Sequence, residues 1–208
     1  MCGRYTLACS DEEALRRGLP FDAFSDTRIE FRPRYNIAPG QRNPVVYLVD
    51  GEPVLRDTLW GLERKGGGIL VNARSETAER ARRFRDAFRE GRCLVPADGF
   101  FEWRREGGRN HPYLFRPTDG GLLLMAGLVE DDRYVVLTED ANEQVSPVHG
   151  RMPVQLEPGA ARRWLESGEL GEVRSLVRRA VSPRVNRVDH DDPECIAPPA
   201  QSELPFDD

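Results

Sequence analysis

The chain has 208 residues, of which 39% are hydrophobic and 31% are charged. A chain of this length forms one ordinary domain or two small ones, and it buries a core without disulfide bonds. Its longest apolar runs, such as 122–126, are too short to cross a membrane, and its N-terminal residues lack the basic and apolar segments of a secretory signal. We therefore expect no membrane association and a cytoplasmic location, nucleoid-associated in a bacterium or nuclear in a eukaryote.

The formal net charge of −5 is unevenly distributed. Seven of the 35 acidic residues lie in 189–208, which contains no Lys or Arg, so residues 1–188 carry a charge of +2. All basic residues except Lys65 are arginines. This bias suits phosphate recognition by planar guanidinium groups, although genome composition or a salty habitat produces the same bias. The charge pattern is compatible with a nucleic-acid partner.

Local signals predict the elements in chain order. Ser10-Asp11-Glu12-Glu13 has the spacing of a helix capping box, and Gly18 follows as a stop, so a short helix is expected here; the segment after it, up to Gly40, is expected to be mostly irregular. An Asp-Gly pair at 50–51 predicts a β-hairpin, and Ser75 or Thr77 can cap a helix that ends at Gly91. The expected helices are 11–17, 75–90, 158–166 and 172–179. The expected strands are 45–49, 54–59, 93–103, 113–115, 122–129 and 134–138.

These elements predict the fold class. Many strands, few helices and no regular β–α–β alternation indicate an α+β fold, mainly an antiparallel sheet or open barrel with flanking helices. No linker divides the chain, so we expect one domain over 1–188 and a loose, acidic, proline-containing tail over 189–208. The tail can mimic DNA, recruit a partner or aid solubility, of which the last is the commonest role. A monomer is expected.

Cysteines and histidines give no sign of a bound metal or cofactor. The four cysteines contain no Cys-x-x-Cys pair, and the three histidines are scattered. In a reducing compartment such thiols stay unpaired. We expect neither a metal nor a cofactor.

Cys2 is the most unusual of these thiols. Removal of Met1 would place a free α-amine beside the thiol, and in peptides these groups titrate near ~8 and ~8.5. Such a 1,2-aminothiol condenses with an aldehyde through an imine to a five-membered thiazolidine. The plainer alternative is an incidental cysteine in a disordered N-terminus.

Three further segments carry side chains suited to chemistry. Asn72 and Arg74 lie where a strand end meets a helix start, a place that attracts anions, unless Arg74 is only a surface residue. Glu102 lies between large aromatics, where a raised pKa suits proton transfer, although an outward-facing Glu on an alternating strand is possible. His149 in a Gly/Arg-flanked loop can shuttle protons near neutral pH, whereas a lone histidine is more often structural.

Five motifs together resemble those of the SRAP family, the SOS-response-associated peptidase-like proteins. The match covers about residues 1–188, and five motifs in order are specific where one alone is not. The motifs are Met1-Cys2-Gly3-Arg4, Tyr35-Asn36-Ile37-Ala38-Pro39-Gly40-Gln41, Asn72-Ala73-Arg74-Ser75-Glu76-Thr77, the segment 93–103, and His149-Gly150-Arg151-Met152-Pro153. One departure is the loop after Trp60-Gly61, which lacks the tryptophan usual in the family.

The resemblance implies an abasic-site processing protein acting on single-stranded DNA. In that family the trimmed N-terminal cysteine forms a thiazolidine with the aldehyde of a ring-opened abasic deoxyribose, so Cys2 would be the covalent residue. Asn72 would hold the N-terminus and the sugar, Glu102 would transfer protons, and His149 would assist ring opening and crosslink reversal. Thr138 resembles the small polar neighbour of the family site.

The same resemblance implies the DNA contacts. Arg4, Arg74 and Arg151 would bind phosphates, and Pro39 would belong to the wedge that admits single strands. Two alternatives stay open: an N-terminal-nucleophile cysteine peptidase, whose only substrate can be its own Met1, and a non-covalent module that binds single-stranded DNA through its arginines.

Overall fold

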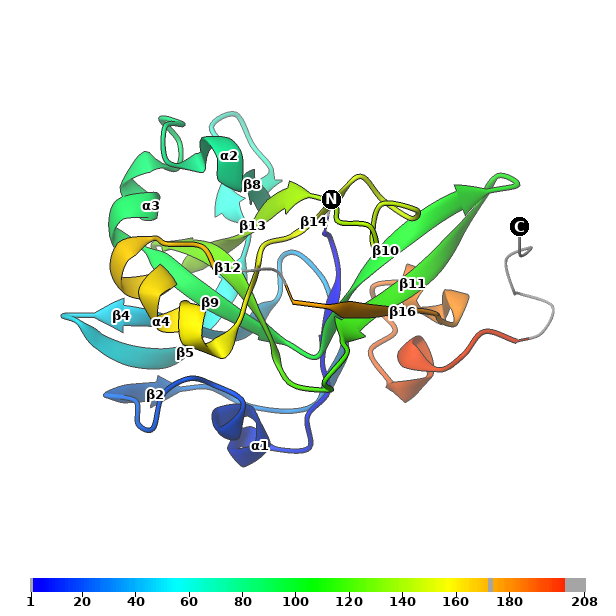
Figure 1. Ribbon diagram of the computed structural model, residues 1–208, viewed down its shortest axis with the longest axis horizontal. Helices are drawn as coiled ribbons and strands as arrows, with labels where there is room; N and C mark the ends of the chain where they lie inside the picture. Colours follow the sequence, from blue (N-terminus) through cyan, green and yellow to red (C-terminus); the bar gives the residue numbers. More distant parts are fainter. Residues whose placement is uncertain (1, 172–173, 201–208) are drawn as a thin grey trace.

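A computed structural model describes residues 2–171 and 174–200. Two sheets dominate it, and their strands are mostly antiparallel (Figure 1). The smaller sheet contains, in spatial order, β16 (Leu176–Ala180), β11 (Arg109–Pro117), β10 (Gly99–Glu106), β1 (Tyr5–Leu7) and β3 (Arg34–Ile37). The larger sheet contains β14 (Arg151–Pro153), β13 (Arg133–Asp140), β12 (Leu123–Glu130), β9 (Arg92–Ala97), β4 (Arg42–Val49), β5 (Glu52–Trp60) and β2 (Asp26–Arg28), with β15 (Gln155–Leu156) beside β12 and β8 (Asn72–Arg74) beside β13.

The larger sheet closes on itself. β13 pairs with β12 on one side and, at Arg133 and Tyr134, in parallel with β5 on the other, so that β13, β12, β9, β4 and β5 form a ring. A separate hairpin is made by β6 (Leu62–Glu63) and β7 (Ile69–Leu70). The prediction of a mainly antiparallel α+β fold is confirmed, and the barrel is closed rather than open.

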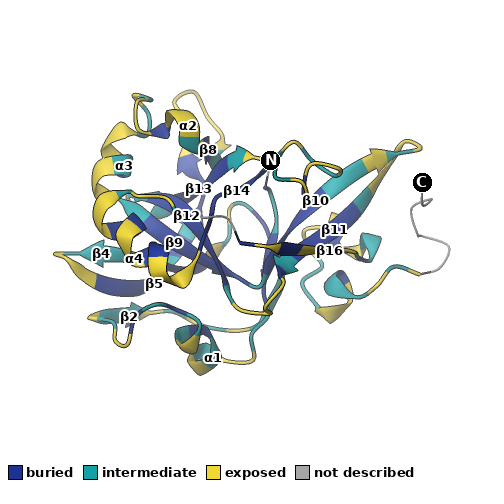
Figure 2. Ribbon diagram, viewed as in Figure 1, coloured by how far each residue is buried: buried dark blue, intermediate teal, exposed yellow. Residues whose placement is uncertain are grey.

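Within the described residues, four α-helices and two 3₁₀ helices cover the sheets. Their bounds are α1 (Glu12–Arg17), α2 (Ser75–Ala78), α3 (Arg85–Glu90), α4 (Pro158–Ser167), η1 (Pro183–Asn186) and η2 (Pro193–Ile196). The exposed faces of α3 and α4 point to solvent while the strands beneath them are buried (Figure 2). In the described part of the chain no helix has the length and apolar character needed to cross a membrane.

Several predicted elements are confirmed. Helix α1 is present, although its cap is Asp11 rather than Ser10: Asp11 Oδ1 accepts a hydrogen bond of 2.8 Å from the amide of Ala14. The hairpin of β4 and β5 turns at Asp50 and Gly51, which both have positive φ, as a tight turn between right-twisted strands requires. The helix expected over 158–166 is present as α4.

Three expectations are corrected. The single helix expected over 75–90 is two short helices, because the chain turns between them and both Ala78 and Ala87 become buried. The helix expected over 172–179 is instead strand β16 from Leu176 onward, because pairing with β11 outweighs the local helix propensity. Residues 172–173 lie outside the described residues. The predicted loose tail is packed against the body at Cys195, which is buried; the end of the tail, 201–208, lies outside the described residues.

An aromatic cluster fixes β1 against the ring of strands. The ring of Trp60 lies 5.2 Å from that of Tyr5 and 6.1 Å from that of Tyr134, and the two tyrosine hydroxyls are 2.7 Å apart. Trp60 Nε1 donates to the carbonyl oxygen of Val71 at 2.9 Å, directly before Asn72. The N-terminal strand and the Asn72 segment are therefore held by the same buried residues.

Candidate active site

Cys2 is enclosed at the start of the chain. It has no exposed surface, its Sγ donates to the carbonyl oxygen of Arg4 at 3.8 Å, and its own carbonyl accepts from Asn72 Nδ2 at 2.8 Å. Burial, and after it the charge of Glu102, raises the pKa of the Cys2 thiol far above its ordinary value. Packing against the core thus shields the Cys2 thiol from water, and the alternative of a cysteine in a disordered N-terminus does not fit this burial.

Glu102 lies beside the N-terminus because of strand register. The amide of Phe101 donates to the carbonyl oxygen of Arg4 at 3.0 Å, so the next residue of β10 is brought to the level of Cys2. Only 2% of Glu102 is exposed, and burial raises its pKa to about 7. The expected raised pKa is confirmed, and near neutral pH this carboxyl exists in both protonated and ionised forms.

His149 approaches the same carboxyl from the loop between β13 and β14. Its Nδ1 lies 3.8 Å from Glu102 Oε1 and accepts a hydrogen bond of 3.0 Å from the amide of Arg151. The loop is shaped by Asn142, whose Oδ1 accepts from the amide of Val145 at 3.1 Å. Nδ1 also lies 3.0 Å from the carbonyl oxygen of Arg151, which can only accept, so the two backbone contacts are compatible with either neutral tautomer of the imidazole.

Arg151 is engaged in ion pairs. Its guanidinium donates to Glu76 and to Asp140, each at 2.6 Å, and to the carbonyl oxygen of Thr138 at 2.6 Å. Thr138 is buried and its Oγ1 lies 3.4 Å from the same guanidinium. Any phosphate that binds Arg151 must therefore share it with two carboxylates, a feature that the sequence motif did not reveal.

Arg4 lines a cavity of about 330 Å³ next to the N-terminus. Its guanidinium donates to Asn36 Oδ1 at 2.7 Å and lies 5.9 Å from the centre of the Trp103 ring. Burial lowers its pKa. Trp103 and Asn186, which complete the cavity wall, were not singled out from sequence; the position of Trp103 directly after Glu102 in an aromatic strand was the available signal.

The remaining predicted residues are less closely connected. Arg74 is exposed, pairs through its backbone with Thr138, and has no carboxylate within ion-pair distance among the described residues. Pro39 is half-buried in the turn between β3 and β4, and within the described chain no hydrogen bond joins it to the other site residues. The structure thus brings together Cys2 with Asn72, and Glu102 with His149.

A larger cavity of about 1080 Å³ lies elsewhere, between α3, the β6 strand and the turn from β12 to β13. It contains none of the predicted site residues, and its wall carries charges of both signs. Within the described residues, no group of three or more His, Cys, Asp or Glu side chains is placed to hold a metal ion.

Known proteins are similar to this chain in sequence and in fold. The chain is 30% identical over 194 residues to "Abasic site processing protein YedK" of Escherichia coli (strain K12), covering 85% of each, and 31% identical over 263 residues to "Abasic site processing protein HMCES" of Gallus gallus, covering 95% of this chain and 78% of that one. A crystal structure of a phage-related protein from Bordetella bronchiseptica superimposes with a TM-score of 0.72 at 31% identity, covering 86% of this chain and 94% of that one. The family model "SOS response associated peptidase (SRAP)" matches residues 1–189. The chain therefore belongs to the SRAP family.

Proposed function

We propose that this chain processes abasic sites in single-stranded DNA by forming a thiazolidine crosslink through Cys2 after removal of Met1. The observation that carries the proposal is the grouping of Cys2, Asn72, Glu102 and His149 at one place, although they come from distant parts of the sequence. The names of the relatives, abasic site processing proteins, agree with it.

The proposed chemistry conserves every atom. Hydrolysis of the Met1–Cys2 bond frees the amine, whose nitrogen attacks the aldehyde carbon of the ring-opened deoxyribose. Loss of water gives an imine, and Sγ then bonds to the same carbon while the thiol proton passes to the nitrogen. The product is a five-membered ring that retains both heteroatoms of Cys2.

Glu102 is suited to the proton transfers of this sequence. In its protonated form it can give a proton to the departing hydroxyl, and in its ionised form it can accept the thiol proton. Burial raises the pKa of Glu102 to about 7 in the chain that retains Met1, and this burial keeps the protonated form accessible near neutral pH. His149, beside the same carboxyl, can protonate the sugar oxygen during ring opening and again during reversal.

Removal of Met1 also changes the thiol itself. The new ammonium group would lie on Cys2, beside the ionisable Glu102, and a neighbouring positive charge lowers a thiol pKa. Asn72 would orient this N-terminus through its bond to the Cys2 carbonyl, while Asn72 Oδ1 has no hydrogen-bond partner within the described chain. That oxygen can accept from an amine or a sugar hydroxyl.

The experiment is incubation with single-stranded DNA that contains one abasic site, followed by denaturing electrophoresis. The wild-type protein should give a heat-stable adduct, Cys2→Ala none, and Glu102→Gln a slower one. Cys9→Ala is the matched control, since Cys9 is another thiol near the N-terminus that is only half-buried. An undiminished adduct with Cys2→Ala would refute the proposal.

The peptidase alternative predicts different behaviour. Mass spectrometry of the purified Cys2→Ala and Glu102→Gln proteins reports whether removal of Met1 depends on these groups, and peptide libraries report cleavage in trans. Turnover of external peptides without any DNA adduct would favour that class. Binding without a covalent fraction, falling steeply with salt, would favour a non-covalent module.

A further inference from the structure

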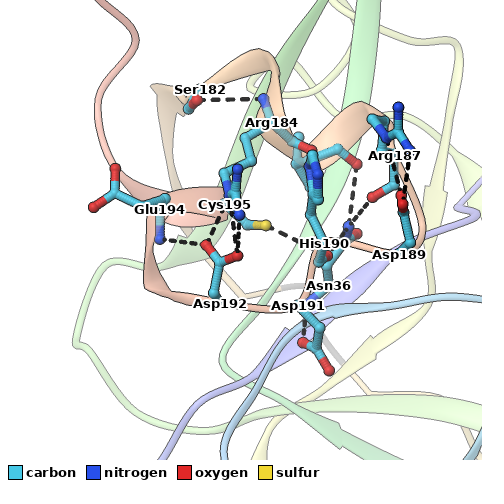
Figure 3. A network of polar contacts seen from close by, with 11 residues as sticks. Asn36, Ser182, Arg184, Arg187, Asp189, His190, Asp191, Asp192, Glu194 and Cys195 are labelled. Carbon is cyan, nitrogen blue, oxygen red and sulfur yellow. Dashed lines mark hydrogen bonds and ion pairs between the residues drawn. The ribbon is translucent and has the colours of Figure 1, made fainter.

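Asn36 in β3 is a fully buried polar residue that holds the chain from Val185 to His190, named here the 185–190 turn. Its Nδ2 donates to the carbonyl oxygens of Val185 at 3.2 Å, Arg187 at 2.8 Å and His190 at 2.7 Å (Figure 3). Three acceptors surround two N–H groups, so the turn is curled around this one amide. Replacing the amide would remove the shared donor from these three carbonyl oxygens and leave the carbonyl oxygens of Arg187 and His190 with only longer contacts, of 3.3 and 3.5 Å.

A carboxylate fixes the same turn to β3 from its far end. Asp191 Oδ1 accepts from the amide of Tyr35 at 2.6 Å and from that of Asn36 at 3.0 Å, and its other oxygen pairs with Arg34. These amides belong to an edge strand of the smaller sheet, so Asp191 takes the place of a further strand. The turn therefore has a fixed position relative to β3.

Because its position is fixed, the 185–190 turn can hold two side chains of the cavity beside the N-terminus. Arg4 donates to Asn36 Oδ1 at 2.7 Å and to the carbonyl oxygen of Val185 at 2.8 Å. Trp103 Nε1 donates to Asn186 Oδ1 at 2.6 Å. One residue, Asn36, is thus bonded to Arg4 directly and to Trp103 through the turn.

We propose that Asn36 is a positioning residue, which sets the orientation of Arg4 and Trp103 at the cavity next to the reactive N-terminus. The inference rests on the proposed function, because the group that these two side chains would meet is a nucleotide next to the abasic site. Asn36 touches no reacting atom, and no hydrogen bond joins it to Cys2, Glu102 or His149. Its loss should weaken capture of the DNA strand and leave the chemical step nearly unchanged.

A first test needs no DNA. Of the three tryptophans, Trp60 and Trp164 have no exposed surface, so iodide quenching of fluorescence reports Trp103. Asn36→Ala should raise the quenching constant about twofold, because release of the turn frees the indole. Asn43→Ala is the control: Asn43 is also a buried asparagine, bonded to Gln41 and Tyr134, and its loss should lower stability without changing the quenching.

A second variant guards against simple unfolding. Asn36→Asp keeps an oxygen for Arg4 but presents an acceptor to the three carbonyl oxygens, so the turn should be released while Arg4 retains one partner. This variant should show the same increase in quenching and a smaller loss of DNA affinity than Asn36→Ala. Equal affinity losses in the two variants would contradict the assigned contact between Asn36 and Arg4.

The decisive test is a double-mutant cycle with Arg4→Ala, read by binding to undamaged single-stranded DNA and by the crosslinking rate. Asn36→Ala should raise the DNA concentration at half-maximal rate about tenfold with a maximal rate within about twofold of wild type. In the Arg4→Ala background its effect should shrink to below about threefold, because the residues act as a unit. Unchanged Trp103 quenching, or fully multiplicative effects, would overturn the inference. Absence of any wild-type adduct would instead refute the proposed function, while the quenching and undamaged-DNA results still decide the role of Asn36.

Discussion

The buried carboxyl of Glu102 makes the stability of this protein depend on pH in a direction opposite to that of a salt-bridged acid. Burial raises its pKa to about 7 in the folded chain, against an ordinary glutamate value of 4.5. Between these two pH values the folded state binds more protons than the unfolded state, so the free energy of unfolding must fall as the pH rises. The difference of 2.5 pKa units corresponds to about 3 kcal/mol.

The perturbation that isolates this effect is Glu102→Gln, which keeps the shape of the side chain and removes its titration. Urea unfolding of both proteins, with the same N-terminus verified by mass, gives the free energy of unfolding from pH 4.5 to 8. The free energy of unfolding of the wild type minus that of Glu102→Gln should decrease by about 3 kcal/mol from pH 4.5 to 8. Most of this decrease should be complete by pH 7. Other titrating groups cancel in the difference. A flat difference, or one that increases with pH, would refute the assignment of a neutral, buried carboxyl.

Three further predictions concern single contacts. Asn72→Ala removes the bond to the N-terminal carbonyl and should lower the crosslinking rate at saturating DNA about tenfold; an unchanged rate would exclude an orienting role. Asp191→Ala removes the acceptor of two β3 amides and should lower the free energy of unfolding by about 2 kcal/mol in urea titrations. The control is Asp189→Ala, which removes an exposed ion pair and should leave stability unchanged. Equal stabilities of the two variants would argue against the capping role of Asp191. Gly99→Ala would press a Cβ against a carbonyl oxygen of β11 and should cost about 1–3 kcal/mol in thermal unfolding, while Gly159→Ala meets open space and should be neutral; a neutral Gly99→Ala would mean that the strands separate easily.

The sequence was sufficient for elements whose signals are local. The capping-box spacing at 10–13, the Asp-Gly turn at 50–51 and the proline at the start of α4 each act on residues a few positions away. The turn and the proline are in place, and α1 begins one residue later than the box predicts, with Asp11 as its cap. Local signals misled where tertiary pairing decided the outcome. Leu176–Ala180 has the composition of a short helix, yet β11 offers it a strand partner along its whole length.

In the candidate site, too, some features could be predicted from local sequence and others depend on tertiary structure. The chemistry of single residues, and then the motif resemblance, made Cys2, Glu102 and His149 candidates, and the aromatic setting of Glu102 was enough to predict its raised pKa. No local pattern predicts that Arg151 lies between two carboxylates. Nor does any local pattern place Asn36 inside a turn about 150 residues later in the chain, because such contacts follow from strand order rather than from spacing.

The bond between Arg4 and the carbonyl oxygen of Val185 joins positions separated by 181 residues. On the ribosome, at about 5–20 residues per second, roughly 10–40 s pass between the synthesis of these two partners. Throughout that interval the nascent chain cannot complete the surroundings of its first strand. We therefore expect the first strand to reach its final burial only after Val185 has left the exit tunnel and the 185–190 turn has docked, so that the last part of the domain to be made completes the first.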